Sequence, residues 1–229
     1  MDLYSQKATS IPQKSVIIFL EIVLLFFSYW ILFKGGGDVL FEKVGINISA
    51  ENFVGRTTIF VFNLVVFVRM TFMMLYLLKR KIPWEESISV PLAFSLYYIG
   101  FSLFVYNRET VFGGMDYFGI ILFGIGSLLN TVSELQRHFW KKKAENKGKL
   151  YTKGLFGYSM HINYFGDVLW VTAFAIITQN YYAFLLPVFL FCMFAFWNIP
   201  LLDKYLSSKY KEQFVKYSKK VKKFVPFVY

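Results

Sequence analysis

Four side chains of different chemistry lie within seven positions of one another: His161, Asn163, Tyr164 and Asp167. They open a hydrophobic segment that directly follows a lysine-rich stretch. Polar and ionisable residues at the edge of a membrane span are costly, so they generally bind or transform something. Amide and carboxylate groups hydrogen-bond the hydroxyls or an amide of a ligand, while arginine and lysine hold phosphates. These residue types therefore predict a site for an anionic cofactor.

Two predicted helical stripes lie on either side of this lysine-rich stretch. The first is spaced four, three and four residues apart: Asn130, Glu134, Arg137 and Lys141. The second is spaced four and three residues apart: Asn163, Asp167 and Trp170. Such spacings place each set on one helical face. The alternative is a helix cap followed by lysines that mark the cytoplasmic side. That alternative explains the lysines but not the His-x-Asn-Tyr-x-x-Asp cluster.

Polar side chains also lie inside predicted spans, namely Glu21, Asn63 and Arg69. A charge near the bilayer centre costs about 2.5–3.5 kcal/mol on insertion scales, so it normally faces the interior of a helix bundle and has a partner. Arg69 could pair with Glu21 or with Asp167. The sequence leaves two interpretations open: an ion pair that fixes helix register, or an arginine that lines a polar cavity.

The composition is that of an integral membrane protein. Of the 229 residues, 56% are hydrophobic and 21% are aromatic, and the mean hydropathy is +0.47. Windows long enough to cross about 30 Å of hydrocarbon predict six spans, at residues 15–33, 57–78, 89–107, 116–133, 163–179 and 181–198. The last two would form a hairpin that turns at Gln179 and Asn180. We therefore expect an all-α membrane protein of about six transmembrane helices in one bundle. It would be a single domain over 1–229, with its cofactor-binding half at about 116–229.

The net charge of +11 is concentrated after the second span, between the fourth and fifth spans, and in the C-terminal tail. With six spans these groups share one side of the membrane, so the positive-inside bias predicts that both termini are cytoplasmic. Apolar residues recur in the tail at helical spacing, with lysines on the other faces: Leu206, Tyr210, Phe214, Tyr217 and Val221. Such an amphipathic basic helix would lie on anionic lipid, or fold over the cytoplasmic mouth and help to close a nucleotide pocket. The two interpretations are compatible.

Several other classes of site are disfavoured. The chain has no phosphate-loop motif, no dinucleotide-binding glycine fingerprint and no HExxH motif. Its two histidines, His138 and His161, are too few for a convincing metal site, so we expect no metal. The single apolar face of the tail and its place beside the membrane favour lipid over nucleic acid as its partner. Residues 34–56, which are glycine-rich at the start, are expected to form a short surface or re-entrant segment.

The stretch GLFGYSMHINYFGD resembles the "GLW-x-Y-S-R-H-P-N-Y-x-G-E/D" signature of a membrane superfamily. Its members include steroid 5-alpha-reductases and their DUF1295 relatives, sterol C14 and C7 reductases, isoprenylcysteine carboxyl methyltransferases and phospholipid methyltransferases. The tail from Asp203 is similar to the "D-x-x-x-x-x-KYG-x-x-x-x-x-Y…P-x-Y" ending of those enzymes. The resemblance covers residues 130–229 well, 66–84 weakly and the first 60 hardly at all.

The resemblance implies a cofactor enclosed by the C-terminal helices, NADPH in the reductases and S-adenosylmethionine in the methyltransferases. Together with Arg137 from the stripe, it makes these residues cofactor-site candidates: Asn130, Glu134, Lys141, Lys149, His161, Asn163, Tyr164, Asp167, Asp203 and Tyr210. Two departures matter. Met160 and Ile162 replace the Arg and Pro of the signature, and Val66 stands where 5-alpha-reductases carry a catalytic tyrosine.

We expect an NADPH-dependent membrane reductase that acts on an activated carbon–carbon double bond in a lipid such as an enone. The candidate proton donors are Glu21, Tyr98 and Tyr164. The first alternative is methyl transfer from S-adenosylmethionine to a lipid or isoprenylcysteine, although this chain has only Asp203 where that class carries a Glu-Glu pair. The second is a non-catalytic lipid-binding scaffold. The expected partners are the bilayer and a lipid substrate, not nucleic acid. The expected location is a bacterial inner membrane or the endoplasmic reticulum, with the cofactor site facing the cytoplasm.

Overall fold

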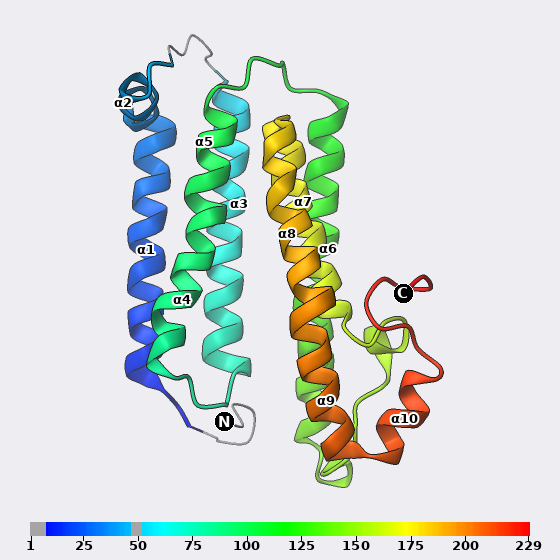
Figure 1. The fold of residues 1–229 in the computed structure, drawn as a ribbon. Coiled ribbons are helices and arrows are strands. Elements are labelled where there is room, and N and C mark those ends of the chain that lie inside the picture. Colours follow the sequence, from blue (N-terminus) through cyan, green and yellow to red (C-terminus); the bar gives the residue numbers. More distant parts are fainter. Residues whose placement is uncertain (1–7, 47–51) are drawn as a thin grey trace. The chain divides into compact units, whose positions relative to one another are not determined.

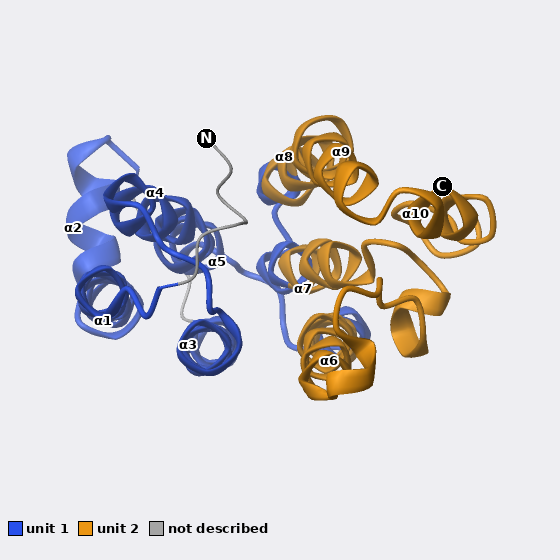
Figure 2. Cartoon of the chain, turned by 90° about the horizontal axis from the view of Figure 1, so that it is seen from below, with its two compact units in different colours: residues 1–119, 174–184 blue, residues 120–173, 185–229 orange. Residues whose placement is uncertain are grey.

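A computed structural model describes residues 8–46 and 52–229, and every regular element in them is helical (Figure 1). The chain forms two compact units, distinguished by colour in Figure 2. Unit 1 comprises Met1–Gly119 and Phe174–Phe184, and unit 2 comprises Ile120–Ala173 and Leu185–Tyr229. The expectation that residues 1–229 form a single domain stays a prediction.

Five helical stretches in the described residues are long and apolar enough to cross a membrane: Ile11–Phe33, Phe53–Leu77, Trp84–Tyr106, Gly114–Lys142 and Tyr181–Tyr210. They correspond to five of the six predicted spans. The remaining one, Ile162–Thr178, is apolar but 17 residues long, at the lower limit for a transmembrane helix. The helical, membrane-type fold is therefore confirmed. The sixth crossing, and with it the side on which the termini lie, stays a prediction.

Unit 1 is built on α1 (Ile11–Phe33), α3 (Phe53–Phe72), and α4 (Trp84–Ser95), which continues into α5 (Phe101–Tyr106). A π-helical turn, Leu96–Gly100, joins α4 to α5, and another, Met73–Leu77, extends α3. Such turns interrupt the regular register of a helix and are frequent at functional sites. The turn between α4 and α5 places Tyr98 in the interior, where it is fully buried.

The short helix α2 (Gly36–Lys43) packs on the end of α5. Phe41 stacks on the Tyr106 ring with 5.9 Å between the ring centroids. A Cβ atom at Gly37 would lie 2.3 Å from that ring, so only glycine permits this approach. The expected surface segment at 34–56 is thus in part a packed helix, and residues 47–51 of that segment lie outside the described residues.

Unit 2 contains most of α6 (Gly114–Lys142) and α7 (Ile162–Thr178), together with α8 (Leu185–Met193), α9 (Ile199–Tyr210) and α10 (Glu212–Ser218). Helix α7 ends at Thr178, and the chain reverses at the predicted Gln179–Asn180 turn, where Gln179 has a left-handed φ of 50°. A second helical stretch then starts at Tyr181 and reaches Tyr210 through a π-helical turn at Phe194–Asn198, so it runs beyond the predicted end at 198.

Two glycines bring α6 and α7 into backbone contact within unit 2. A Cβ atom at Gly126 would lie 2.6 Å from the Trp170 amide nitrogen, and one at Gly166 would lie 2.7 Å from the Asn130 amide nitrogen. Backbone atoms cannot move aside without separating the helices. Glycine at these two positions therefore sets the spacing between the two stripes predicted from the sequence.

The Gly166→Ala variant is expected to lose about 1–3 kcal/mol of stability through overpacking against the α6 backbone. The measurement is the thermal unfolding temperature of the detergent-purified protein. Gly124→Ala is the matched control on α6, because a Cβ there meets nothing within 4 Å. An unfolding temperature for Gly166→Ala equal to that of Gly124→Ala would contradict the proposed close contact.

The tail differs from its predicted form. A single amphipathic helix was expected, but the helix breaks at Lys211, which has a φ of 44°, into α9 and α10. The apolar residues nevertheless share one cluster, in which Tyr210, Phe214 and Tyr217 pack with Met160. The break lets α10 fold back onto the loop before α7, so this apolar face contacts protein. The two predicted roles of the tail, lying on anionic lipid and closing a nucleotide pocket, stay predictions.

Candidate functional site

The residues of the motif are held in place by the tail. The amide groups of Met160 and His161 donate hydrogen bonds to the carbonyl oxygens of Lys222 and Lys223, at 2.8 and 3.0 Å. The Ser159 hydroxyl donates to the carbonyl oxygen of Phe224 at 2.7 Å. Residues 222–224 therefore form a strap, defined here by these three residues, that fixes the chain immediately before α7.

Tyr217 provides a second anchor for the same loop. Its hydroxyl donates a 2.6 Å hydrogen bond to the carbonyl oxygen of Phe156. Burial raises the pKa of the Tyr217 phenol, which keeps it protonated and able to donate. Phe156 in turn packs with Tyr151 and Ile162 in a buried cluster. The loop between α6 and α7 is thus attached to both the tail and the core of unit 2.

His161 and Asp203, which are 42 residues apart, form the first polar group of the site. The distance from His161 Nε2 to Asp203 Oδ1 is 2.9 Å, and the imidazole is 1% exposed. The second oxygen of Asp203 lies 3.8 Å from Lys223 Nζ. The Tyr164 ring stacks between the His161 ring and the Phe194 ring, with centroid distances of 5.7 and 4.5 Å. The imidazole therefore has a fixed orientation and a carboxylate partner.

The second polar group joins α6 to the first turn of α7. Asn163 Nδ2 donates to Glu134 Oε1 at 3.0 Å, and Asn130 Nδ2 donates to the Asn163 carbonyl oxygen at 3.2 Å. The other oxygen of Glu134 pairs with Arg137, whose guanidinium also lies over the Phe156 ring at 5.4 Å. Both oxygens of the Glu134 carboxylate thus have partners, and its side chain is 13% exposed. The two stripes predicted from the sequence are therefore joined at Asn163.

The other predicted cofactor residues of unit 2 have different surroundings. The Asp167 carboxylate accepts a 2.7 Å hydrogen bond from Trp170 Nε1 along α7. Lys141 interacts electrostatically with Glu134, Arg137 and Lys209. Lys149 is exposed in the loop between α6 and α7. Tyr210, by contrast, is buried in the apolar cluster with Met160, which makes packing its main observed contact.

The predicted proton donors fall into different units. Tyr164 belongs to unit 2, whereas Glu21 and Tyr98 belong to unit 1. Glu21, Arg69 and Tyr98 come from α1, α3 and the π-helical turn and are 3%, 8% and 0% exposed. The charges of Glu21 and Arg69 both act on the Tyr98 hydroxyl. We call these three residues the buried acid cluster. The cluster therefore contains two of the three predicted donors, Glu21 and Tyr98, together with Arg69.

A second polar layer lies further along the same helices. Asn63 Nδ2 donates to Ser28 Oγ at 2.9 Å, and the hydroxyls of Ser28 and Ser102 are 2.8 Å apart. Ser28 follows Glu21 by seven residues and Ser102 follows Tyr98 by four, so each pair shares a helical face. Ser28 and Ser102 were missed by the sequence reasoning. The seven-residue spacing from Glu21 is the signal that could have revealed Ser28.

A buried ion pair was also missed. Arg108 is the first residue after the predicted span 89–107, Asp116 is the first residue of the next span, and their side chains are 1% and 0% exposed. Arg108 Nη1 lies 2.5 Å from Asp116 Oδ1, and Nη2 lies 2.8 Å from Oδ2. Arg108 Nη1 also donates to the Ile177 carbonyl oxygen at 2.7 Å. Opposite charges on either side of a short loop were the available signal.

Comparison with known proteins identifies the family. A sequence profile described as "Protein of unknown function (DUF1295)" matches residues 87–221, which is more than half of the chain. The chain belongs to the DUF1295 family. In this DUF1295 protein, the matched region contains Tyr98, Tyr210 and the two polar groups of unit 2. Glu21, Arg69 and the strap lie outside the matched region.

This DUF1295 protein is also similar to a curated protein named "Probable O-methyltransferase ustE" from Ustilaginoidea virens. The two are 33% identical over 93 residues, which are 40% of this chain and 32% of the relative. The similarity therefore involves about a third of that relative's length. Family membership and this partial similarity agree with the superfamily indicated by the motif.

Proposed function

We propose that this protein is a membrane reductase that uses NADPH and acts on an activated carbon–carbon double bond in a lipid, such as an enone. The observation that carries the proposal is the buried acid cluster. A phenol buried among apolar helices, next to a carboxyl and a guanidinium, is a suitable group to polarise a carbonyl oxygen. Two charges that serve only to fix helix packing do not need a buried tyrosine hydroxyl beside them.

Each member of the cluster has a role in this proposal. The Tyr98 hydroxyl donates a hydrogen bond to the carbonyl oxygen of the lipid, which draws electron density away from the conjugated double bond. As the hydride adds, Tyr98 gives its proton to that oxygen, so the enone gains one hydride and one proton, and the phenolate takes up a proton again through Glu21. Arg69 stabilises the negative charge that develops on that oxygen. Glu21 is a positioning residue that orients the hydroxyl. The surrounding apolar residues exclude water, which strengthens each of these interactions.

Unit 2 has the groups that an anionic nucleotide cofactor requires. The carboxylates of Glu134 and Asp203 and the amide of Asn163 suit hydroxyl and carboxamide groups. The first turn of α7 has its amide groups at the positive end of the helix dipole, and Arg137 and Lys223 add positive charge. When bound, NADPH would supply the hydride. The residues of unit 2 would hold and orient it, and the strap would keep His161 and Asn163 in position.

A cavity in unit 2 offers space for phosphate groups beside this site. It has a volume of about 330 Å³ and lies between the loop at Leu150 and Thr152 and the side chains of α10. Lys216 and Lys220 lie on its wall, and Gln213 Oε1 accepts a hydrogen bond from the Leu150 amide at its edge. Two lysines beside a buried tyrosine, Tyr217, give the positive potential that phosphate binding requires. The lysine-rich composition of this region also supports a cytoplasmic location.

Methyl transfer is the second candidate, because a relative named as an O-methyltransferase matches part of the chain. In that case unit 2 would bind S-adenosylmethionine, and the Glu134 and Asp203 carboxylates would face its positively charged sulfonium and amino groups. The residues that hold the cofactor would be largely the same. The two candidates are therefore distinguished by which cofactor binds.

The deciding experiment titrates the detergent-purified protein separately with NADPH and S-adenosylmethionine. We expect saturable binding of NADPH, weakened about tenfold or more in Asn163→Ala, because hydrogen bonds that involve charged groups contribute about 1.5–3 kcal/mol. Thr172→Ala, two turns further along α7, is the matched control and should bind as the unaltered protein does. Preferential binding of S-adenosylmethionine would favour methyl transfer, and binding of neither would contradict both proposals.

A further inference from the structure

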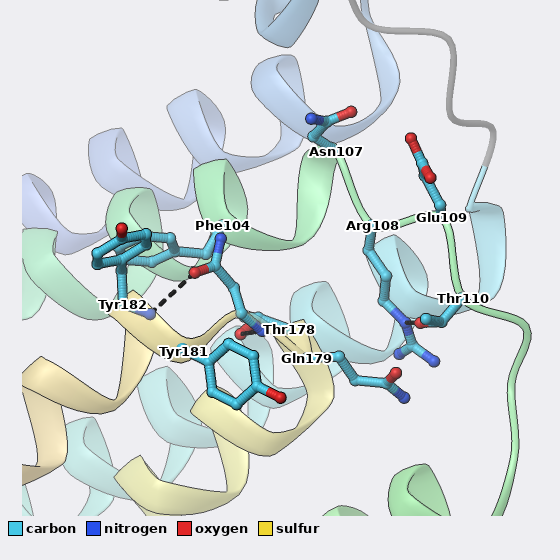
Figure 3. Close-up of a pocket in the computed structure, with 10 residues that line it drawn as sticks. Phe104, Asn107, Arg108, Glu109, Thr110, Thr178, Gln179, Tyr181 and Tyr182 are labelled. Carbon is cyan, nitrogen blue, oxygen red and sulfur yellow. Dashed lines mark hydrogen bonds between the residues drawn. The ribbon is translucent and has the colours of Figure 1, made fainter.

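Two neighbouring cavities lie in unit 1, and neither is lined by a residue of the buried acid cluster. The larger, of about 500 Å³, is mainly apolar and lies between Leu40, Phe41 and Val44 of the α2 region and Leu103 and Phe104 of α5. The smaller, of about 310 Å³, is lined mainly by polar residues from the loops at 107–110 and 178–182 (Figure 3). Phe104, Asn107 and Asn180 line both cavities. The two cavities are therefore adjacent, one mainly apolar and the other lined mainly by polar residues.

The polar end does not offer a free positive charge. Arg108 is the cation of its lining, and that guanidinium is already bound to Asp116, to the Ile177 carbonyl oxygen and to Thr110 Oγ1 at 2.7 Å. Glu109 beside it is exposed and acidic. An anionic headgroup would meet a carboxylate here and find no unpaired cation among the lining residues. Charge complementarity therefore selects a ligand whose polar group is uncharged.

The hydrogen-bonding groups at the polar end are amides and hydroxyls. Asn107 and Gln179 line it with Asn180, whose Oδ1 accepts a 2.9 Å hydrogen bond from the Tyr182 amide. That bond orients the amide of Asn180, which lines both cavities. Side-chain amides both donate and accept, which matches hydroxyl groups. These groups suit an alcohol better than an ion.

We propose that the adjacent cavities bind a single-chain lipid with an uncharged, hydroxyl-bearing headgroup. Its hydrocarbon chain lies between α2 and α5, and its hydroxyls contact Asn107, Gln179 and Asn180. Both volumes fall within the range of about 300–1,000 Å³ that is typical of ligand sites. The site uses no residue of the buried acid cluster and no residue of unit 2, so it is independent of the proposed reaction.

The surroundings of the two cavities are those of a membrane interface. Val44 and Ile46 are 68% and 45% exposed, which is costly in water but not against lipid chains. Tyr181 and Tyr182 are 91% and 73% exposed at the polar end. Tyrosine is enriched at the boundary between hydrocarbon and headgroups. A lipid can therefore enter from the bilayer with its chain toward α2 and its headgroup toward the tyrosines.

The test compares two lipids with the same chain, 1-monooleoylglycerol and oleate, on the full chain purified in detergent. Binding is followed by native mass spectrometry over a range of lipid concentrations. We expect saturable binding of one monooleoylglycerol and at least about tenfold weaker binding of oleate, because the carboxylate would face Glu109. The Glu109→Gln variant should reduce the difference in affinity between monooleoylglycerol and oleate. Equal binding of the two lipids, or binding that does not saturate, would overturn the proposal.

Two variants locate the ligand. Leu103→Trp fills the apolar end and should weaken monooleoylglycerol binding, whereas Leu92→Trp on the exposed face of α4 should not. Asn107→Ala removes an exposed amide, which leaves folding intact, and should weaken binding about two- to tenfold. If neither Leu103→Trp nor Asn107→Ala changes the affinity, the lipid binds elsewhere and the proposal is wrong.

Discussion

Replacement of Tyr98 by phenylalanine is expected to lower the turnover of an enone lipid by about 10²- to 10⁴-fold, the usual contribution of a general acid. The ring is fully buried, and phenylalanine preserves its volume, so the variant removes the hydroxyl and little else. The measurement is NADPH consumption with a cyclic enone in detergent. Binding of NADPH should stay unchanged, because the residues proposed to hold it belong to unit 2.

Two companion variants separate chemistry from structure. Tyr97→Phe alters the neighbouring, half-buried tyrosine of the same π-helical turn and should leave turnover unchanged. Glu21→Gln should lower turnover to a smaller extent, because a positioning residue acts through the hydroxyl. Normal turnover by Tyr98→Phe would remove Tyr98 from the mechanism, even if NADPH binding by unit 2 is confirmed.

Replacement of Arg108 by methionine is expected to lower the free energy of unfolding by about 3–5 kcal/mol. Methionine is similar in length but leaves Asp116, which is 0% exposed, without the guanidinium that offsets its charge. It also removes the hydrogen bond to the Ile177 carbonyl oxygen that ties α7 to this loop. Chemical or thermal unfolding in detergent measures the loss.

The control is the more exposed pair of Arg80 and Glu86, whose side chains are 26% and 24% exposed. Arg80→Met should cost about 1 kcal/mol or less, as ion pairs near solvent do. The double variant Arg108→Met with Asp116→Leu should recover much of the lost stability, because an apolar pair leaves no uncompensated charge. Equal losses for Arg108→Met and Arg80→Met would contradict this account of the buried pair.

The helices of this fold could be predicted because their signal is local. A stretch such as Ile11–Phe33 is apolar along its whole length, and hydropathy locates it to within a few residues. The Gln179–Asn180 turn could also be predicted, because two side-chain amides interrupt an apolar stretch. The break at Lys211 was not predicted, because the apolar period continues through it. A periodic pattern reports which residues share a surface but not whether one helix carries them.

Some contacts of the candidate site could be predicted from the sequence and others could not. Spacing alone placed Asn130 and Glu134 on one face and Asn163 on the next helix, and the structure joins them through hydrogen bonds. The bond between His161 and Asp203 spans 42 residues, so the pairing itself has no local signal, although resemblance had marked both residues. The strap could not be predicted at all. Its contacts use backbone carbonyls, which every residue type has.

The strap holds the motif through main-chain atoms of residues 222–224, and this affects how the sequence can drift over evolutionary time. A carbonyl oxygen accepts a hydrogen bond whichever side chain is attached to its residue. Point substitutions at Lys222 therefore leave the contact in place. A single-residue insertion or deletion between Tyr217 and Lys222 would instead shift every acceptor by one position. Selection in this segment accordingly acts on the number of residues and on the course of the backbone. Related chains can therefore share the strap even when the amino-acid sequences of their tails differ.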